Sequence, residues 1–275
     1  MPDVNKRYKA TDVGIEGYYK NLVITNNASN PNTQIDITAD TVYLATTDTP
    51  PKLFRWRSVS ETANVVLGVA VNGLDAGVEA INTMYALWLI GKSDLTVIDC
   101  LLSTSFSAPT MPSGYDCKLL VGAIRNGGGT AAIDPEGSGH FNRIYQTGRV
   151  VRYINRKTVV TAKPGDANWT GLDFATTNRL IPSNSTTALV LCKMVQGGTA
   201  VAADLHLSNV AAGVYSATYP GILVLEVPNV INIVMSTGLI DSPLTTVQVM
   251  TYRQSDIAAN TPTPTIYLCG YILNL

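Results

Sequence analysis

The sequence has few charges, few histidines and no long apolar run. Charged residues make up 14% of its 275 residues, and 19 basic against 20 acidic side chains leave a net charge of −1. This balance argues against a nucleic-acid partner, whose binders usually carry a strongly basic face. A hydrophobic content of 46% argues against disorder. The apolar runs, such as residues 86–90, are far shorter than the roughly 18 residues of a membrane helix, so we expect no membrane insertion.

Cysteine is also sparse. The chain has four, Cys100, Cys117, Cys192 and Cys269, and none belongs to a Cys-x-x-Cys pair, which argues against a structural zinc site. Residues 1–7 lack the apolar stretch of a secretory signal, so we expect reduced, buried thiols. A disulfide between Cys100 and Cys117 across a hairpin is the disfavoured alternative.

Threonine, asparagine and glycine are abundant, with 31, 20 and 22 residues. Thr and Val suit the pleated surface of strands, whereas Asn and Gly suit turns. Short apolar segments follow one another, and in the second half turn signals recur every eight to twelve residues. We therefore expect an all-β protein with one or two antiparallel β-sandwich (jelly-roll-like) domains and an extended N-terminal arm.

The expected organisation has three parts. Residues 1–34 form the arm, residues 35–160 form a β-sandwich domain, and residues 161–275 form a second β-rich domain or continue the sandwich. In the middle part we expect a mixed apolar strand at 64–71 and a strand at 84–90 that is buried on both faces. A short helix near 76–82, capped by Asp75, is the only helix that the sequence suggests.

One block of the sequence resembles a module found in structural and tail-associated proteins of tailed bacteriophages. It reads Asn-Gly-Leu-Asp-Ala-Gly at 72–77, Tyr-Ala-Leu-Trp-Leu-Ile at 85–90 and Ala-Pro-Thr-Met-Pro-Ser-Gly-Tyr at 108–115, followed by Val-Gly-Ala-Ile-Arg-Asn at 121–126. The resemblance covers residues 36–155 and has no counterpart at 160–275. It implies a β-sandwich in a virion component, and it implies no catalytic residue.

Two histidines are the first candidates for chemistry. His140 follows Asp134 and Glu136 in a glycine-rich stretch, and His206 comes two residues after Asp204 on an expected strand. No nucleophile motif or metal-ligand spacing accompanies either one, so polar surface roles are favoured. We expect no catalytic residue, no metal ligand and no cofactor, and we expect that the protein is not an enzyme.

The strongest charge feature is the stretch 143–163. It holds six basic side chains and no acid: Arg143, Arg149, Arg152, Arg156, Lys157 and Lys163. Basic residues interleaved with aromatic ones, here Tyr145 and Tyr153, can bind nucleic acid or an anionic glycan. Because residues 201–275 hold four acids against one base, an ion-pairing surface within or between subunits is the favoured interpretation.

The tryptophans differ in their surroundings. Trp88 lies in an apolar run and is expected in the core, whereas Trp56, between two arginines, and Trp169, in a polar stretch, suit contacts with another protein better than a glycan site. The predicted interface or ligand contacts are Trp56, Tyr145, Arg149, Arg152, Tyr153 and Trp169.

These observations favour a non-enzymatic structural protein of a tailed-phage virion that acts through packing between subunits. It would be either a capsid decoration protein or a tail- or fibre-associated subunit. The expected partners are further copies in a homo-oligomer and other virion proteins, and the expected location is the virion. The alternative is a receptor-binding module that grips a cell-surface glycan through Trp169, Tyr145 and the basic stretch.

Overall fold

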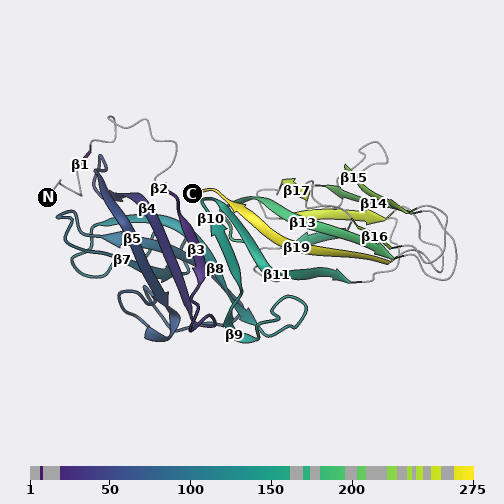
Figure 1. Ribbon diagram of the computed structural model, residues 1–275, viewed down its shortest axis with the longest axis horizontal. Coiled ribbons are helices and arrows are strands. Elements are labelled where there is room, and N and C mark those ends of the chain that lie inside the picture. The colour runs from purple at the N-terminus through teal and green to yellow at the C-terminus, as the bar shows by residue number, and fades with distance from the viewer. Residues whose placement is uncertain are drawn as a thin grey trace. The chain divides into compact units, whose positions relative to one another are not determined.

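The protein is an all-β protein whose strands pair antiparallel (Figure 1). The computed structural model describes residues 7–8, 19–161, 170–173, 180–195, 203–208, 222–227, 234–236, 240–243, 249–254 and 263–275. Among these residues the only helical element is the short 3₁₀ turn η2 at Val65–Leu67. The expected fold class is thus confirmed.

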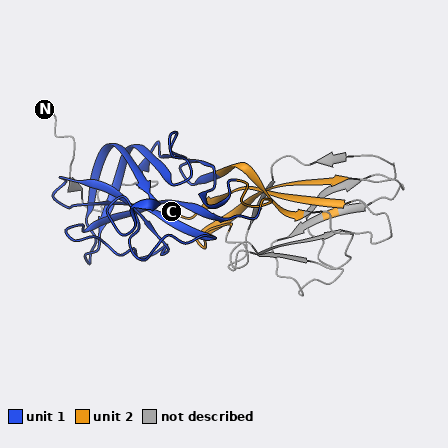
Figure 2. Ribbon diagram, turned by 90° about the horizontal axis from the view of Figure 1, so that it is seen from below, with its two compact units in different colours: residues 1–130, 136–151, 275 blue, residues 131–135, 152–274 orange. Residues whose placement is uncertain are grey.

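The chain forms two compact units that are interleaved in sequence (Figure 2). Unit 1 comprises residues 1–130, 136–151 and 275, and unit 2 comprises residues 131–135 and 152–274. The chain passes from unit 1 to unit 2 inside one strand, β11 at Val150–Thr161. The division therefore falls at 151/152, whereas the sequence suggested a boundary at 160/161.

The described residues of unit 1 that precede β11 form ten strands, which fall into two groups. The first group surrounds β4 and contains β1 (Arg7–Tyr8), β2 (Tyr19–Lys20), β3 (Val23–Asn26), β4 (Gln34–Thr46), β5 (Leu53–Asn64) and β10 (Ile144–Thr147). The second group contains β6 (Thr83–Gly91), β7 (Ile98–Ser103), β8 (Cys117–Gly128) and β9 (Ser138–Phe141). The end of β4 pairs with the start of β8 and joins the groups. Within the region expected as an arm, β1 pairs with β5, while β2 and β3 pair with β4.

Two glycines show where the faces of these groups approach most closely. A Cβ added at Gly91 on β6 would lie 2.8 Å from the Trp56 ring on β5. A Cβ added at Gly122 on β8 would lie 2.7 Å from both Ile24 on β3 and Gln146 on β10. Real Cβ atoms do not approach other atoms this closely, so a side chain at Gly91 would displace the Trp56 ring, and one at Gly122 would displace the ends of the Ile24 and Gln146 side chains. The unit is therefore sandwich-like, with its core between the two groups.

Strand β6 is buried at all nine positions, as the sequence predicted for 84–90. It lies between β7 and β8 in its sheet. Its even-numbered residues Ala86, Trp88 and Ile90 form a cluster with Leu101. Against this cluster pack Phe106, Met111 and Tyr115 of the connection between β7 and β8, together with Leu120 of β8. Successive side chains of a strand point to opposite faces. The second face of β6 is therefore covered by this connection between β7 and β8.

Unit 2 contains two described sheets. The order β16-β13-β19-β11 forms the first, with β13 at Ser185–Val195, β16 at Val234–Ser236 and β19 at Thr263–Leu273; β17 (Ile240–Pro243) also pairs with β13. The second has the order β12-β18-β14-β15, with β12 at Thr170–Asp173, β14 at Ala203–Ser208, β15 at Ile222–Val227 and β18 at Val249–Gln254. Buried and partly buried residues alternate along β19, as expected where one face packs on a core.

Two local expectations were wrong. The mixed apolar run 64–71 is not a strand, because β5 ends at Asn64 and the chain turns into η2, leaving Val66, Leu67 and Val69 exposed. Residues 76–82 form no helix. Gly77 has a φ of +76°, which a right-handed helix does not contain.

The cysteines are all free thiols, as expected. Cys100, Cys117 and Cys192 are buried, and Cys269 is partly exposed. Cys100 lies opposite Leu89 on one side of β6, and Cys117 lies opposite Gly91 on the other side. Two strand spacings amount to about 9.5 Å, which exceeds the roughly 7 Å that a disulfide can span between Cα atoms. These two cysteines therefore cannot pair in this fold.

Candidate functional site

Two separate segments of unit 1 fold against each other through hydrogen bonds. We call this structure the clasp and define it as residues 72–75 together with 99–115. Asn72 begins it. Its φ of +63° is one that Asn tolerates well. Its side-chain oxygen accepts a hydrogen bond from the Cys100 amide at 2.9 Å, and its side-chain nitrogen donates to the Asp99 carboxylate at 3.1 Å. Asn72 thereby fixes the turn after η2 to strand β7.

Asp75 connects the two most distinctive parts of the block. Its carboxylate accepts hydrogen bonds from the Ser103 hydroxyl at 2.7 Å and from the Thr110 amide at 2.8 Å, 35 residues along the chain. The Asp75 amide donates to the carbonyl of Leu102 at 2.8 Å. We expected this carboxylate to cap a helix; instead it holds the connection 104–116 against β7.

The Pro-Ser-Gly-Tyr turn closes the clasp. The Tyr115 amide donates to the Pro112 carbonyl at 3.2 Å, and Gly114 has a φ of +84°, which favours glycine. The Tyr115 hydroxyl donates to the Asp99 carboxylate, and the Lys92 ammonium lies 5.5 Å from the centre of the Tyr115 ring. The turn is thereby held to β7 and to the loop after β6.

Trp88 is the buried side chain against which the clasp packs. Its indole nitrogen donates to the carbonyl of Ser105 at 3.0 Å, and the Lys118 ammonium lies 5.3 Å from its ring centre. The prediction that Trp88 belongs to the core is confirmed. Because the ring meets both an apolar cluster and a backbone acceptor, it fixes the position of the connection that covers β6.

The electrostatics of the clasp disfavour nucleophilic chemistry at its thiol. Burial first, then the nearby Glu61 and Asp99 carboxylates, raise the pKa of the Cys100 thiol well above its ordinary value. Burial first, then its bond to Asp99, likewise raise the pKa of Tyr115. A protonated, buried thiol is a poor nucleophile. Burial, aided by Asp99, raises the pKa of Glu61 on β5 to about 7.

The predicted contact residues do not form one surface. Trp56 was expected to make external contacts, but its side chain is only 3% exposed and lies in the core of unit 1. Tyr153 is also buried, and its hydroxyl donates to the carbonyl of Leu180. Tyr145, Arg149 and Arg152 are exposed. Trp169 lies outside the described residues.

The basic stretch is divided in the same way. Arg143 is fixed within unit 1, where its guanidinium donates to the Pro31 carbonyl at 2.6 Å and to the Asn32 side chain at 2.6 Å. Lys157 is fully buried, with its ammonium 5.0 Å from the Tyr153 ring centre. Lys163 lies outside the described residues. Exposed positive charge on the described part of unit 2 comes from Arg152 and Arg156 of β11.

Neither histidine is part of a catalytic or metal cluster in the part of the chain that the structure describes. The Nδ1 atom of His140 lies against the carbonyl of Glu136, and His206 lies on β14 opposite Leu223 and Arg253. The described residues contain no group of three or more His, Cys, Asp or Glu side chains that could hold a metal ion. They also include no helix long and apolar enough to span a membrane.

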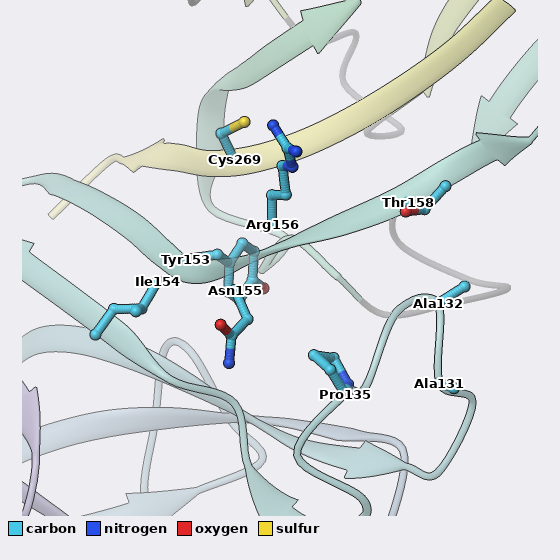
Figure 3. Close-up of a pocket in the computed structure, with 9 residues that line it drawn as sticks. All are labelled: Ala131, Ala132, Pro135, Tyr153, Ile154, Asn155, Arg156, Thr158 and Cys269. Carbon is cyan, nitrogen blue, oxygen red and sulfur yellow. The ribbon is translucent and has the colours of Figure 1, made fainter.

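The sequence analysis missed two surface features. The first is the loop 76–82 of unit 1, whose apolar side chains Val78 and Ile81 are exposed by 83% and 57%. The sequence suggested a short helix at 76–82, so an exposed apolar loop was not expected there. The second is an open hollow of about 610 Å³ in unit 2 between β11 and the loop 131–135 (Figure 3). No sequence pattern marks it, because its walls come from separate segments.

Comparisons with known proteins give no family. No protein-family model matches the chain, and no curated protein matches it significantly. Among solved structures, a chain from "Structure of infectious bursal disease virus Gx strain" has 12% sequence identity to this chain. The match covers 98% of this chain and 68% of that one, with a TM-score of 0.17. A TM-score this low does not indicate a common fold.

Proposed function

We propose that the protein is a non-enzymatic structural subunit of a tailed-phage virion, which acts by packing against further copies of itself and against other virion proteins. The observation that carries this proposal is the clasp. The two most specific parts of the phage-like block, at 72–75 and 108–115, fold against each other through Asp75 and Thr110. The block thus behaves as one structural module.

The chemistry of the clasp side chains supports a structural role. Asn72, Asp75, Asp99 and Tyr115 all make hydrogen bonds to groups of their own chain. A network satisfied in this way stiffens the fold and fixes one register of the covering segment. A rigid, weakly charged β-sandwich suits repeated packing in a shell or tail, because a small net charge gives little repulsion between copies.

Immunogold labelling of purified particles tests the proposal. The particles would come from the phage or induced prophage whose genome encodes the chain, and the antibody would be raised against the recombinant protein. Dense label over the head would identify a decoration protein, and label restricted to the tail would identify a tail- or fibre-associated subunit. Absence of the protein from particles, checked by mass spectrometry of the same preparation, would overturn the proposal.

A glycan-binding role would need a different result. Binding to a glycan array that is lost in the Trp169→Ala variant would favour the receptor-binding alternative. Of the aromatic residues assigned to that role, Tyr145 is exposed and Tyr153 is buried. Among the described residues, Tyr145 is therefore the one exposed aromatic side chain of those expected to contact a glycan.

A further inference from the structure

The loop 76–82 of unit 1 presents apolar side chains to solvent. Every residue from 76 to 82 is exposed, with Val78 and Ile81 exposed by 83% and 57%. The loop contains one acid, Glu79, and no base, and Asp75 immediately precedes it. Single exposed apolar residues are ordinary, whereas two of them within one seven-residue loop form a small apolar patch, the kind of feature found at contact surfaces.

Side chains of β8 and β6 hold this loop in place through hydrogen bonds. Asn126, which is fully buried, donates through its side-chain amide to the Glu79 carboxylate at 2.9 Å and to the Ala80 carbonyl at 3.0 Å. Arg125, only 1% exposed, donates to the Asn82 side chain at 2.7 Å, and the Ala80 amide donates to the Tyr85 hydroxyl at 2.8 Å. A loop already ordered in the free protein loses less entropy when it binds.

The hollow in unit 2 has the complementary composition. Figure 3 shows Ala131, Ala132 and Pro135 of one loop beside strand β11, which contributes Ile154 and Arg156. Ile154 is 66% exposed, and the Thr158 amide donates to the Ala132 carbonyl at 2.8 Å, which anchors the loop to the strand. The nine lining residues include a base and no acid.

Arg156 is held at this site by its own contact. Its guanidinium lies 4.4 Å from the centre of the Tyr267 ring, a cation–π geometry that orients a planar guanidinium. Arg152, also exposed, adds a second positive charge on the same strand. A hollow with a mixed apolar and polar lining, edged by positive charge, therefore lies in unit 2, and an exposed loop with apolar side chains and a negative charge lies in unit 1.

We propose that the loop 76–82 of one copy of this chain inserts into the hollow of a second copy. Val78 and Ile81 pack against Ile154 and Pro135, and the Glu79 carboxylate faces Arg156. The inference deepens the proposed function, on which it rests, by naming the surface between copies. Because loop and hollow are different surfaces, the contact is head-to-tail, and its repetition closes a ring or extends a filament.

Sedimentation velocity of the full chain over a range of concentrations tests the interface. The wild-type protein is expected to associate, and Val78→Arg and Arg156→Glu are each expected to weaken association about tenfold or more, as for substitutions at the centre of an interface. Val66→Arg places the same charge on another exposed valine, 65% exposed in η2, and is expected to leave association unchanged. Ile154→Glu serves as a second variant of the hollow.

A mixture of Val78→Arg and Arg156→Glu gives the sharpest outcome. In the mixture, the unaltered loop of the Arg156→Glu variant meets the unaltered hollow of the Val78→Arg variant, so association in pairs is expected to recover. A monomeric wild-type protein, undiminished association in both single variants, or a mixture that does not recover would overturn the inference. Self-association through another surface would leave the proposed virion role intact, since particle labelling decides that role separately.

Discussion

The connection 104–116 of the clasp and the loop 76–82 are both irregular segments of unit 1 that hydrogen bonds from other segments hold in place. Their apolar residues nevertheless differ, because those of the connection are packed inward and those of the loop are exposed. In the clasp, Phe106, Met111 and Tyr115 pack on the cluster around Trp88. In the loop, Val78 and Ile81 face solvent. Hydrogen-bonded anchoring alone therefore does not distinguish a loop that covers the core from a loop that exposes apolar side chains. The direction of the apolar side chains does.

The largest expected effect on the free energy of unfolding comes from removing Trp88, the buried side chain against which the clasp packs. Trp88→Ala deletes a buried indole and leaves the Ser105 carbonyl without its donor, so we expect a loss of about 3 to 5 kcal/mol in the free energy of unfolding. Urea denaturation would measure it. Val78→Ala in the other loop is the matched control, with an expected change within about 0.5 kcal/mol. Equal losses in the two variants would contradict the difference between the loops.

Asp75 is expected to have the next largest effect. Asp75→Ala leaves the buried Ser103 hydroxyl and the Thr110 amide without their acceptor, which should cost about 2 to 3 kcal/mol in chemical denaturation. The double variant Asp75→Ala/Ser103→Ala should lose less free energy of unfolding than the two single variants lose together, because both substitutions remove the same hydrogen bond. Full additivity would show that the two side chains do not interact.

The Asn126→Ala variant tests whether association depends on the order of the loop 76–82 in addition to its apolar side chains. Asn126→Ala removes the anchoring of Glu79 and Ala80 and should lower stability by about 1 to 2 kcal/mol. If the rigid loop is the contact surface, the same variant weakens association although Val78 and Ile81 are unchanged. Hydrogen exchange of the Ala80 amide should rise in parallel. Unaltered association in a variant with a demonstrably mobile loop would show that preorganisation is not needed.

The smallest expected effect is a pH dependence of the free energy of unfolding, which arises from Glu61 on β5. The pKa of Glu61 is raised to about 7 in the folded protein from an ordinary 4.5, so the folded state binds the proton more tightly than the unfolded state. This contribution to stability is complete below pH 4.5 and is lost as the pH rises through about 7. Glu61→Gln should flatten that part of the stability profile, measured as the free energy of unfolding between pH 4.5 and 8. An unchanged slope in Glu61→Gln would assign the dependence to another group.

The sequence predicted the features that depend on local patterns. The all-β class followed from composition, and the burial of β6 on both faces followed from an uninterrupted apolar run. The role of Trp88 followed from the same run. In each case the physical cause acts over a few residues, so the pattern is visible in a short window.

The features that the sequence did not predict depend on contacts between distant segments. Asp75 looked like a helix cap because its partner Thr110 lies 35 residues away. The sequence suggested a short helix at 76–82, but Gly77 and the bonds from Asn126 favour an irregular loop. Trp56 looked like a contact residue between two arginines, yet strand alternation turns it toward Gly91 in the core.

The interleaving of the two units limits how such a protein can be exchanged between genomes. Residues 131–135 belong to unit 2 although they lie within the sequence of unit 1, and β11 contributes to both units. No single crossover can therefore transfer one unit complete and leave the other intact. A recombinant joined inside this region would have to inherit residues 131–152 as one block, so the two units are expected to be inherited together rather than shuffled as separate cassettes.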